Sequence, residues 1–386
     1  RVSGAPEVFG ELPMVCLAEE IESPGEGQVR ALITVASNPV LSAPNGPRLS
    51  RALEGLDFML SLDIYLNETT RHADLILPAP SPLEDLHYDI AFGQLSWRNN
   101  ARYSGPVFER PSDMPEEWET LSRLAALVSG GDWRQPPAEL DTAALRHELR
   151  HQLKDPDGAR TEPLLAALAP RVGPERLIDL ALRSGPYGDQ FGRQPDGLTL
   201  ERVKAAPHGI DLGELQPRIP ELLRTPSGRI ELAPPPFLEA LAALATEQPP
   251  AAGPDELLLI GRRDLRSGNS WMHNLPVLAK GPDRSALILH PEDARRRGLQ
   301  DGDRALLRNA AGTTVEVLLQ CSEEMMPGVA SLPHGWGHDL PGTQLSVAQL
   351  RPGANLNALL DERVRDPLSG NAVLSGQAVT LSALPA

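Results

Sequence analysis

The chain has 386 residues, more than one ordinary hydrophobic core can fill, so two or three domains are expected. Hydrophobic residues make up 41% of it, which indicates a folded protein rather than a disordered one. The formal net charge of −16 argues against nucleic acid as a partner, because binding a phosphate backbone needs a basic surface. No apolar run approaches the roughly 18 residues of a membrane span. Without a signal-peptide core, a cytoplasmic location is expected.

The chain contains only two cysteines, Cys16 and Cys321, far apart in sequence. Because no Cys-x-x-Cys pair occurs, we predict no iron–sulfur or cysteine-type zinc site and interpret both thiols as structural. The sequence starts at Arg1 without an initiator methionine. We therefore expect a fragment, a processed product or one piece of a split subunit.

Apolar strands alternate with helical segments in the first part of the chain. Residues 29–36, 57–62 and 73–78 have the composition of buried strands, and residues 48–56 can form a short helix between the first two. This order predicts a doubly wound α/β domain, which we place at residues 1–130.

Polar residues follow two of these strands. Asn38 comes after the first strand, and Asp63 comes after the apolar Leu62 that ends the second. In a doubly wound sheet, ligands bind beyond the carboxyl ends of the strands, where an aspartate can accept hydrogen bonds from a ribose or a guanine. Asn before Pro and Asp after a strand are also common turn residues, and residue type alone favours that simpler interpretation.

Residues 131–254 predict a helical and irregular connecting region that ends in a proline-rich linker. Helices are expected at 140–153 and 174–183. His147 and His151 are four residues apart, a spacing that can hold a metal ion. Their helix is rich in Arg and Glu, so we interpret it as a solvated face and assign no metal ligand.

Short strands separated by turns fill residues 255–386 and predict a β-rich barrel domain. Its first strand ends at a glycine that is followed by clustered hydrogen-bond donors. Backbone N–H groups and guanidinium groups that converge after a strand can bind an anion, although spacing alone fits a solvated arginine loop equally well. The residues of this candidate loop are Gly261, Arg262, Arg263, Arg266, Ser267, Asn269, Ser270 and His273.

Several segments carry a family resemblance, among them 33–39, which resembles the strand followed by Asn-Pro in the family's nucleotide-binding α/β domain. Gly261-Arg-Arg-x-x-Arg-Ser-x-Asn-Ser-Trp-Met-His-Asn274 resembles the start of the molybdopterin-dinucleotide-binding domain of the molybdopterin oxidoreductases, which include formate dehydrogenases, nitrate reductases and dimethyl sulfoxide reductases. The segment 63–78 resembles the family signature whose acidic residue contacts guanosine. The segment 291–303 resembles the family's double-psi β-barrel, and 354–357 resembles its closing asparagine segment.

The resemblance implies a bis(molybdopterin guanine dinucleotide) cofactor, bis-MGD, with Mo or W. It further implies that the metal ligand and any iron–sulfur cluster lie in an upstream region that this chain lacks, so no catalytic residue is assigned here. A small-molecule redox substrate and electron-transfer subunits are the implied partners. The cofactor-binding positions that match the family are Asn38, Leu62, Asp63, Gly261, Arg262, Arg263, Arg266, Ser267, Asn269, Ser270, His273 and Asn357.

These observations predict the C-terminal part of a molybdenum or tungsten oxidoreductase that performs two-electron chemistry, similar to formate dehydrogenase or nitrate reductase. The alternative is a non-catalytic nucleotide-binding or assembly module with the same folds and no metal. A hydrolase that uses His72 or His338 ranks below both, because no Ser or Cys nucleophile lies in an elbow sequence.

Overall fold

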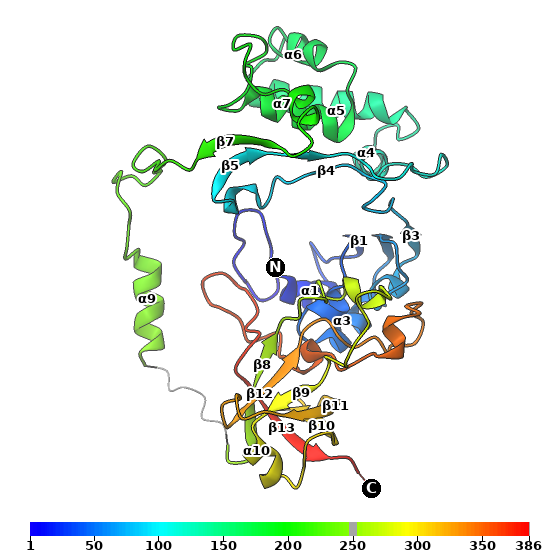
Figure 1. Cartoon of the computed structure of the whole chain (residues 1–386), viewed down its shortest axis with the longest axis vertical. Helices are drawn as coiled ribbons and strands as arrows, with labels where there is room; N and C mark the ends of the chain where they lie inside the picture. The colour runs from blue at the N-terminus through cyan, green and yellow to red at the C-terminus, as the bar shows by residue number, and fades with distance from the viewer. Residues whose placement is uncertain (247–252, 386) are drawn as a thin grey trace. The chain divides into compact units, whose positions relative to one another are not determined.

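Figure 1 shows the computed structural model, which describes residues 1–246 and 253–385. The chain forms two compact units, Arg1–Pro78 together with Glu231–Ala386, and Ala79–Ile230. The predicted boundaries at 130 and 254 differ from this division. The difference arises because the first segment of the chain packs with the C-terminal barrel, whereas the residues between them build separate cores. Most of the predicted linker lies outside the described residues.

The first unit contains a three-stranded parallel sheet in the order β1-β2-β3. Helices α1 and α3 pack against each other, and their apolar side chains share a core with Met59 of the sheet. The opposite face of the sheet exposes Ile33, Val35, Phe58 and Leu75. The elements are α1 (Leu17–Glu22), β1 (Ala31–Val35), α2 (Pro39–Ser42), α3 (Gly46–Leu53), β2 (Phe58–Leu62) and β3 (Leu75–Leu77).

Six strands of the first unit close into a barrel in the order β10-β11-β9-β12-β8-β13, as the sequence predicts for this region. Two neighbouring pairs, β8 with β12 and β9 with β11, are parallel, and the other pairs are antiparallel. Alternate side chains point inward and form a leucine-rich core. The elements are β8 (Glu256–Arg262), β9 (Leu287–Leu289), α10 (Pro291–Arg296), β10 (Arg304–Asn309), β11 (Thr314–Cys321), β12 (Val329–Pro333) and β13 (Gln377–Ala383).

The second unit is mainly helical, with two small antiparallel sheets that pair β4 with β6 and β5 with β7. Its helices share a core that includes Leu145, Leu149 and Leu168. His147 and His151 are exposed, in agreement with the interpretation of a solvated face. The elements are β4 (His87–Tyr88), β5 (Arg98–Ala101), β6 (Tyr103–Ser104), α4 (Glu117–Val128), α5 (Pro137–Gln152), α6 (Thr161–Leu168), α7 (Gly173–Ser184), α8 (Leu200–Lys204) and β7 (Ile210–Glu214).

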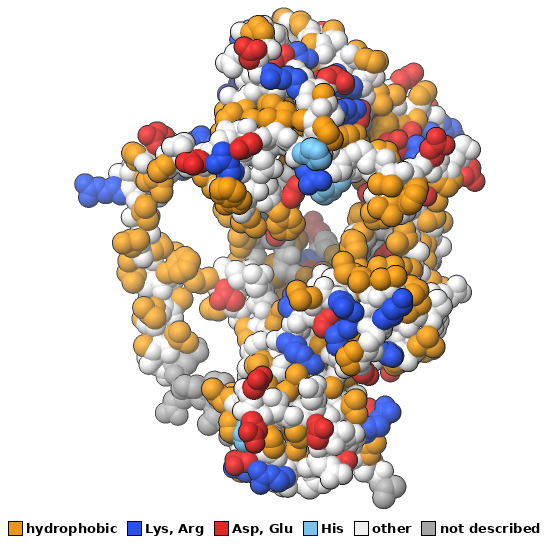
Figure 2. All heavy atoms as spheres, viewed as in Figure 1, with side chains coloured by type: hydrophobic (Ala, Val, Ile, Leu, Met, Phe, Trp, Pro, Cys, Tyr) orange, Lys and Arg blue, Asp and Glu red, His pale blue; other side chains and the backbone are white. Residues whose placement is uncertain are grey.

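Helix α9 (Pro235–Leu244) exposes Phe237, Leu238, Leu241 and Leu244, and the corresponding part of Figure 2 is largely orange. Within the described ranges, none of the helices combines the length and apolar character that crossing a bilayer requires.

The alternation along β11 yields a stability prediction. Leu319 is 2% exposed in the barrel core, whereas its neighbour Leu318 is 39% exposed. We expect Leu319→Ala to lower the free energy of unfolding by about 2–5 kcal/mol, because it leaves a cavity. Leu318→Ala, the matched control, should cost about 1 kcal/mol or less. Denaturant unfolding of both variants measures the difference, and equal losses would contradict the inward and outward assignment.

Candidate functional site

The carboxyl ends of β1 and β2 lie side by side, and Ala36 N donates to Leu62 O at 2.8 Å. Asp63 follows directly, with its Oδ1 accepting from Tyr65 N at 3.0 Å and its Oδ2 accepting from Asn67 Nδ2 at 3.1 Å. Burial raises the pKa of the Asp63 carboxyl, and within the described residues no cation forms an ion pair with it. The carboxylate is therefore fixed in direction and keeps lone pairs for a further donor.

Asn38 and Leu62 contribute differently from Asp63. Asn38 Nδ2 donates to Glu68 Oε2 at 2.8 Å, and its Oδ1 accepts from Thr69 Oγ1 at 2.7 Å, so its amide holds the turn at residues 67–70. Leu62 is buried, and only its backbone lies at the edge of the sheet. The cofactor-binding assignment of both residues stays a prediction.

Arg262 lies at the end of β8 and points into the barrel wall. Its guanidinium donates to the carbonyl oxygens of Ser331 at 2.5 Å, Ala286 at 2.5 Å and Arg284 at 3.2 Å. Burial lowers its pKa. These bonds join β8 to β12 and to the start of β9, so the geometry favours a structural role over the predicted contact with an anion.

The other two arginines of the loop face outward. Arg263 Nη1 donates to Asn269 Oδ1 at 2.6 Å, and Arg266 lies on the exposed side of the loop. Asn269 has a left-handed backbone with φ of 57°. Its carbonyl lies so close to Gly335 that a Cβ there would be 2.1 Å from the oxygen. The loop and the glycine-rich segment after β12 are therefore interlocked.

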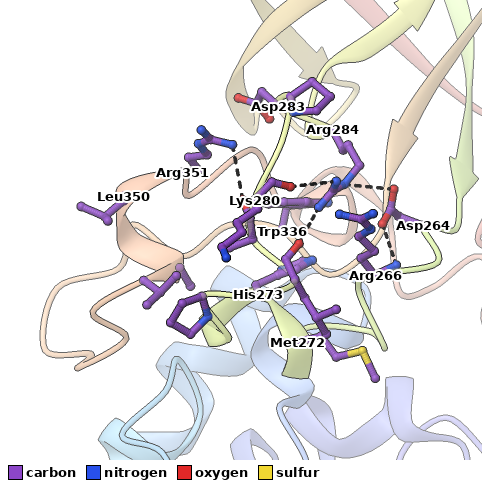
Figure 3. Close-up of a pocket in the computed structure, with 16 residues that line it drawn as sticks. Asp264, Arg266, Met272, His273, Lys280, Asp283, Arg284, Trp336, Leu350 and Arg351 are labelled. Atoms are coloured by element: carbon purple, nitrogen blue, oxygen red, sulfur yellow. Dashed lines mark hydrogen bonds and ion pairs between the residues drawn. The ribbon is translucent and has the colours of Figure 1, made fainter.

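A cavity of about 350 Å³ opens beside this loop (Figure 3). Of the charged side chains that line it, four are basic and two are acidic. The indole N–H of the buried Trp336, which also lines it, has no hydrogen-bond partner among the described residues. An excess of cations beside an unpaired donor suits an anionic group such as a phosphate. The charged lining residues are Arg266, Lys280, Arg284, Arg351, Asp264 and Asp283.

Four buried side chains form a continuous hydrogen-bonded row, here called the buried relay: Ser267, His273, His338 and Glu68. Ser267 Oγ lies 3.0 Å from His273 Nε2, His273 Nδ1 lies 2.9 Å from His338 Nε2, and His338 Nδ1 lies 3.0 Å from Glu68 Oε1. All four are at most 5% exposed. The relay connects the loop after β8 to the turn after β2, and through Asn38 it reaches the end of β1.

The electrostatics of the relay differ from one end to the other. Burial, with His338 as the next cause, lowers the pKa of His273 to about 4, and Trp336 stacks on its ring at 3.8 Å. Burial alone would raise the pKa of Glu68, but hydrogen bonds from His338 and Asn38 outweigh it and hold the pKa below its ordinary value. Glu68 is thus a buried carboxylate, and His273 is neutral around neutral pH.

The relay contains two residues that the sequence interpretation did not assign to the site, Glu68 and His338. Glu68 lies in the signature 63–78, and His338 was considered as a residue of the hydrolase alternative. Their contact joins positions 270 residues apart, and only the fold reveals it.

Asn357 is completely buried where the barrel meets α2. Its Nδ2 donates to Leu41 O at 2.5 Å and lies 3.1 Å from His334 Nδ1, while its Oδ1 has no partner among the described residues. Burial lowers the pKa of His334, with Arg263 as a second cause. Asn357 therefore anchors the barrel to the sheet, and a direct contact with the cofactor stays a prediction.

The interlock between Gly335 and Asn269 can be tested with a matched pair of substitutions. Gly335→Ala should lower the free energy of unfolding by more than the roughly 1–2 kcal/mol that a left-handed backbone costs an alanine. The extra loss arises because the new methyl group meets the Asn269 carbonyl. Gly342 has a similar φ, and a Cβ there meets nothing within 4 Å, so Gly342→Ala should show only the backbone cost. Denaturant unfolding compares the two, and equal losses would show that the contact is loose.

Comparison with known proteins finds a family match for the C-terminal part of the chain. Residues 257–376 match the family described as "Molydopterin dinucleotide binding domain". A stretch of 124 residues is 32% identical to the assimilatory nitrate reductase catalytic subunit of Bacillus subtilis (strain 168), covering 31% of this chain and 17% of the relative. Over 352 residues the chain is 25% identical to Probable oxidoreductase YoaE of the same strain. This match covers 90% of this chain and 44% of the relative.

The fold is similar to the solved structure of acetylene hydratase from Pelobacter acetylenicus. The TM-score is 0.61 at 19% sequence identity, and the match covers 96% of this chain and 46% of that one. The chain thus spans less than half the length of the relatives it matches. The predicted resemblance to the molybdopterin-dinucleotide-binding domain of the molybdopterin oxidoreductases is confirmed by the domain match. By this match residues 257–376 form a molybdopterin dinucleotide-binding domain, and the chain is similar to parts of a nitrate reductase catalytic subunit and of a probable oxidoreductase.

Proposed function

We propose that this chain is the dinucleotide-holding part of a molybdenum or tungsten oxidoreductase with a bis-MGD cofactor. The observation that carries the proposal is the basic cavity beside the loop after β8, inside the matched domain. Its unpaired Trp336 indole N–H and its four basic side chains fit the phosphates of a dinucleotide.

Separate groups of the chain would hold separate parts of the cofactor. Arg266, with Lys280 and Arg284 of the same cavity lining, would bind phosphate oxygens. The Asp63 carboxylate would accept from the donor edge of guanine, since its present hydrogen bonds fix its direction without a paired cation. When bound, the metal of this cofactor supplies the two-electron redox chemistry, and the residues of this chain bind and orient the cofactor.

Two features of the fold support a more specific architecture. We propose that the barrel, with its two parallel pairs among antiparallel ones, is of the double-psi type. We also propose that the three-stranded sheet is part of a doubly wound domain. Parallel sheets are normally covered on both faces, and the apolar face with Ile33, Val35 and Phe58 is exposed here.

The activity of the whole protein is part of the same proposal. Two-electron oxidation or reduction of a small molecule, of the formate dehydrogenase or nitrate reductase kind, would use electron-transfer subunits as partners. The match to a nitrate reductase catalytic subunit supports this direction.

The proposal is tested by counting cofactor on protein purified from cells that make it. Acid-released guanosine monophosphate and bound Mo or W should be found at two nucleotides for each metal, as the bis form of the cofactor requires. Protein with neither metal nor nucleotide would instead indicate the alternative, a non-catalytic nucleotide-binding or assembly module.

Asp63 yields a specific prediction. Asp63→Ala should weaken retention of the guanine nucleotide about 10- to 100-fold, because a hydrogen bond to a charged group contributes about 1.5–3 kcal/mol. Asp57 lies at the opposite end of β2 in an exposed ion pair with Arg30, so Asp57→Ala is the matched control and should retain the nucleotide. Released nucleotide per chain after dialysis is the measurement. Equal retention by both variants would remove Asp63 from the site.

A further inference from the structure

Another cavity, of about 620 Å³, lies in the second unit, outside the matched domain 257–376. It opens among α5, α6 and α7, which lie together in Figure 1. Glu139, Thr142 and Arg146 line it from α5, and their spacing of three and four residues puts them on one face of that helix. Arg171 and Arg176 line it from the start of α7 and the residues before that helix.

Most of the charge in this cavity is positive. Three of the four charged side chains that line it are arginines, Arg146, Arg171 and Arg176, and the fourth is the exposed Glu139. Guanidinium groups present paired N–H donors that match the oxygens of a phosphoryl or carboxylate group. The lining therefore suits an anion with more than one negative charge.

Carboxylates that are not part of the lining hold two of these arginines. Arg146 donates to Glu162 from Nε at 2.9 Å and from Nη2 at 3.3 Å. Arg171 donates to Asp179 Oδ2 at 3.1 Å and to Glu201 Oε1 at 2.7 Å. These bonds fix the guanidinium groups in direction, while Arg146 Nη1 and Arg171 Nε keep no protein acceptor among the described residues. A binding site needs such preorganised donors.

The third arginine, Arg176, is buried, with 5% of its surface exposed. Its Nη1 donates to Thr142 Oγ1 at 2.9 Å, and its Nη2 donates to Asp141. Its Nε is buried without an acceptor among the described residues. Because an unpaired buried N–H is costly, an anionic oxygen at this wall of the cavity would supply what the protein does not.

Helix α7 begins at the same cavity. Its N-cap residue Val172, which lines the cavity, provides no side-chain cap, and Gly173 N donates to Asp141 Oδ2 at 2.9 Å. The N-terminal end of a helix of this length carries a partial positive charge. This charge adds to the field of the arginines.

We propose that this cavity binds a small organic phosphate. The phosphoryl group carries nearly two negative charges at neutral pH and would lie on the three arginines. The organic part would lie against Leu165 and Val172, since a volume of this size holds a small molecule rather than a lone ion. The site is separate from the cavity beside the loop after β8, so it does not rest on the proposed function.

The proposal is tested by isothermal titration calorimetry of the full chain with n-propyl phosphate at about pH 7.5 and constant ionic strength. Binding should saturate, and it should be tighter than binding of inorganic phosphate, which lacks the apolar part, and of butyrate, which has a single charge. Absence of saturable binding would overturn the proposal. Equal affinities for n-propyl phosphate and butyrate would contradict the phosphoryl group.

A matched pair of variants places the ligand. Arg146 and Arg150 both donate to Glu162, but only Arg146 of these two lines the cavity. Arg146→Ala should weaken n-propyl phosphate binding about two- to fivefold, the range of an exposed charge pair, and Arg150→Ala should leave it unchanged. Glu139→Gln should strengthen binding by a similar factor, because it removes a like charge. Equal affinities of the two arginine variants, or no gain in Glu139→Gln, would overturn the site.

Two further variants separate this site from its surroundings. Arg176→Lys keeps a charge beside Asp141 but loses the Nε donor, so it should weaken binding about tenfold or more, with denaturant unfolding to verify that it is folded. A folded Arg176→Lys with wild-type affinity would contradict the contact. Arg266→Ala alters the basic cavity of the first unit and should leave n-propyl phosphate binding unchanged. Loss of binding in Arg266→Ala would move the ligand to the first unit and overturn the proposal.

Discussion

A carboxylate with no exposed surface needs a compensating partner, and in this protein the partner of Glu68 is a histidine from a different part of the fold. Glu68 follows β2, and His338 lies in the glycine-rich segment after β12. Separating the sheet from the barrel would leave both groups buried or expose both to water, and either outcome is costly. Together with Asn357, which donates to Leu41 O, this pair makes the sheet and the barrel a single unit.

In the loop after β8, one arginine is held by hydrogen bonds within the barrel and another borders the cavity. Arg262 has its guanidinium on three backbone carbonyls and belongs to the barrel, whereas Arg266 borders the cavity. Two arginines four residues apart therefore have opposite roles, because one is at the end of a strand and the other is in the turn beyond it. Arg262 thus holds the start of the loop rigid, while Arg266 stays accessible from the cavity. A preorganised binding site requires such rigid support around accessible groups.

Local patterns in the sequence predicted most of the elements. The strand expected at 57–62 is β2 at Phe58–Leu62, and the strand expected at 73–78 contains β3 at Leu75–Leu77, because apolar runs bounded by turn residues are a local signal. The strand that closes the barrel, β13, was not predicted, although its buried Val379 and Leu381 alternate with polar neighbours. Without the partner strands, an alternation of apolar and polar residues over so few positions is a weak signal of a strand.

Candidate site residues could be chosen from the sequence by type, but their contacts could not be predicted, and their binding of the cofactor stays a prediction. The sequence identified Ser267, His273 and Asp63, whose positions follow strand ends, and these do lie around the edge of the sheet and the loop. It could not distinguish Arg262 from Arg266, because the direction of a side chain depends on the register of the closed barrel. It also could not pair Glu68 with His338, since nothing local couples them.

The first unit is assembled from the two ends of the chain, and this affects the order in which it can form during synthesis. Glu68 and His338 are 270 positions apart, so at about 5–20 residues per second the ribosome needs roughly 15 to 50 seconds between them. During that time residues 1–78 have no barrel to pack against, while the residues at 79–230 can already fold on their own core. Until then the Glu68 carboxylate of the nascent sheet stays in water, and the barrel closes only after β13 has been made.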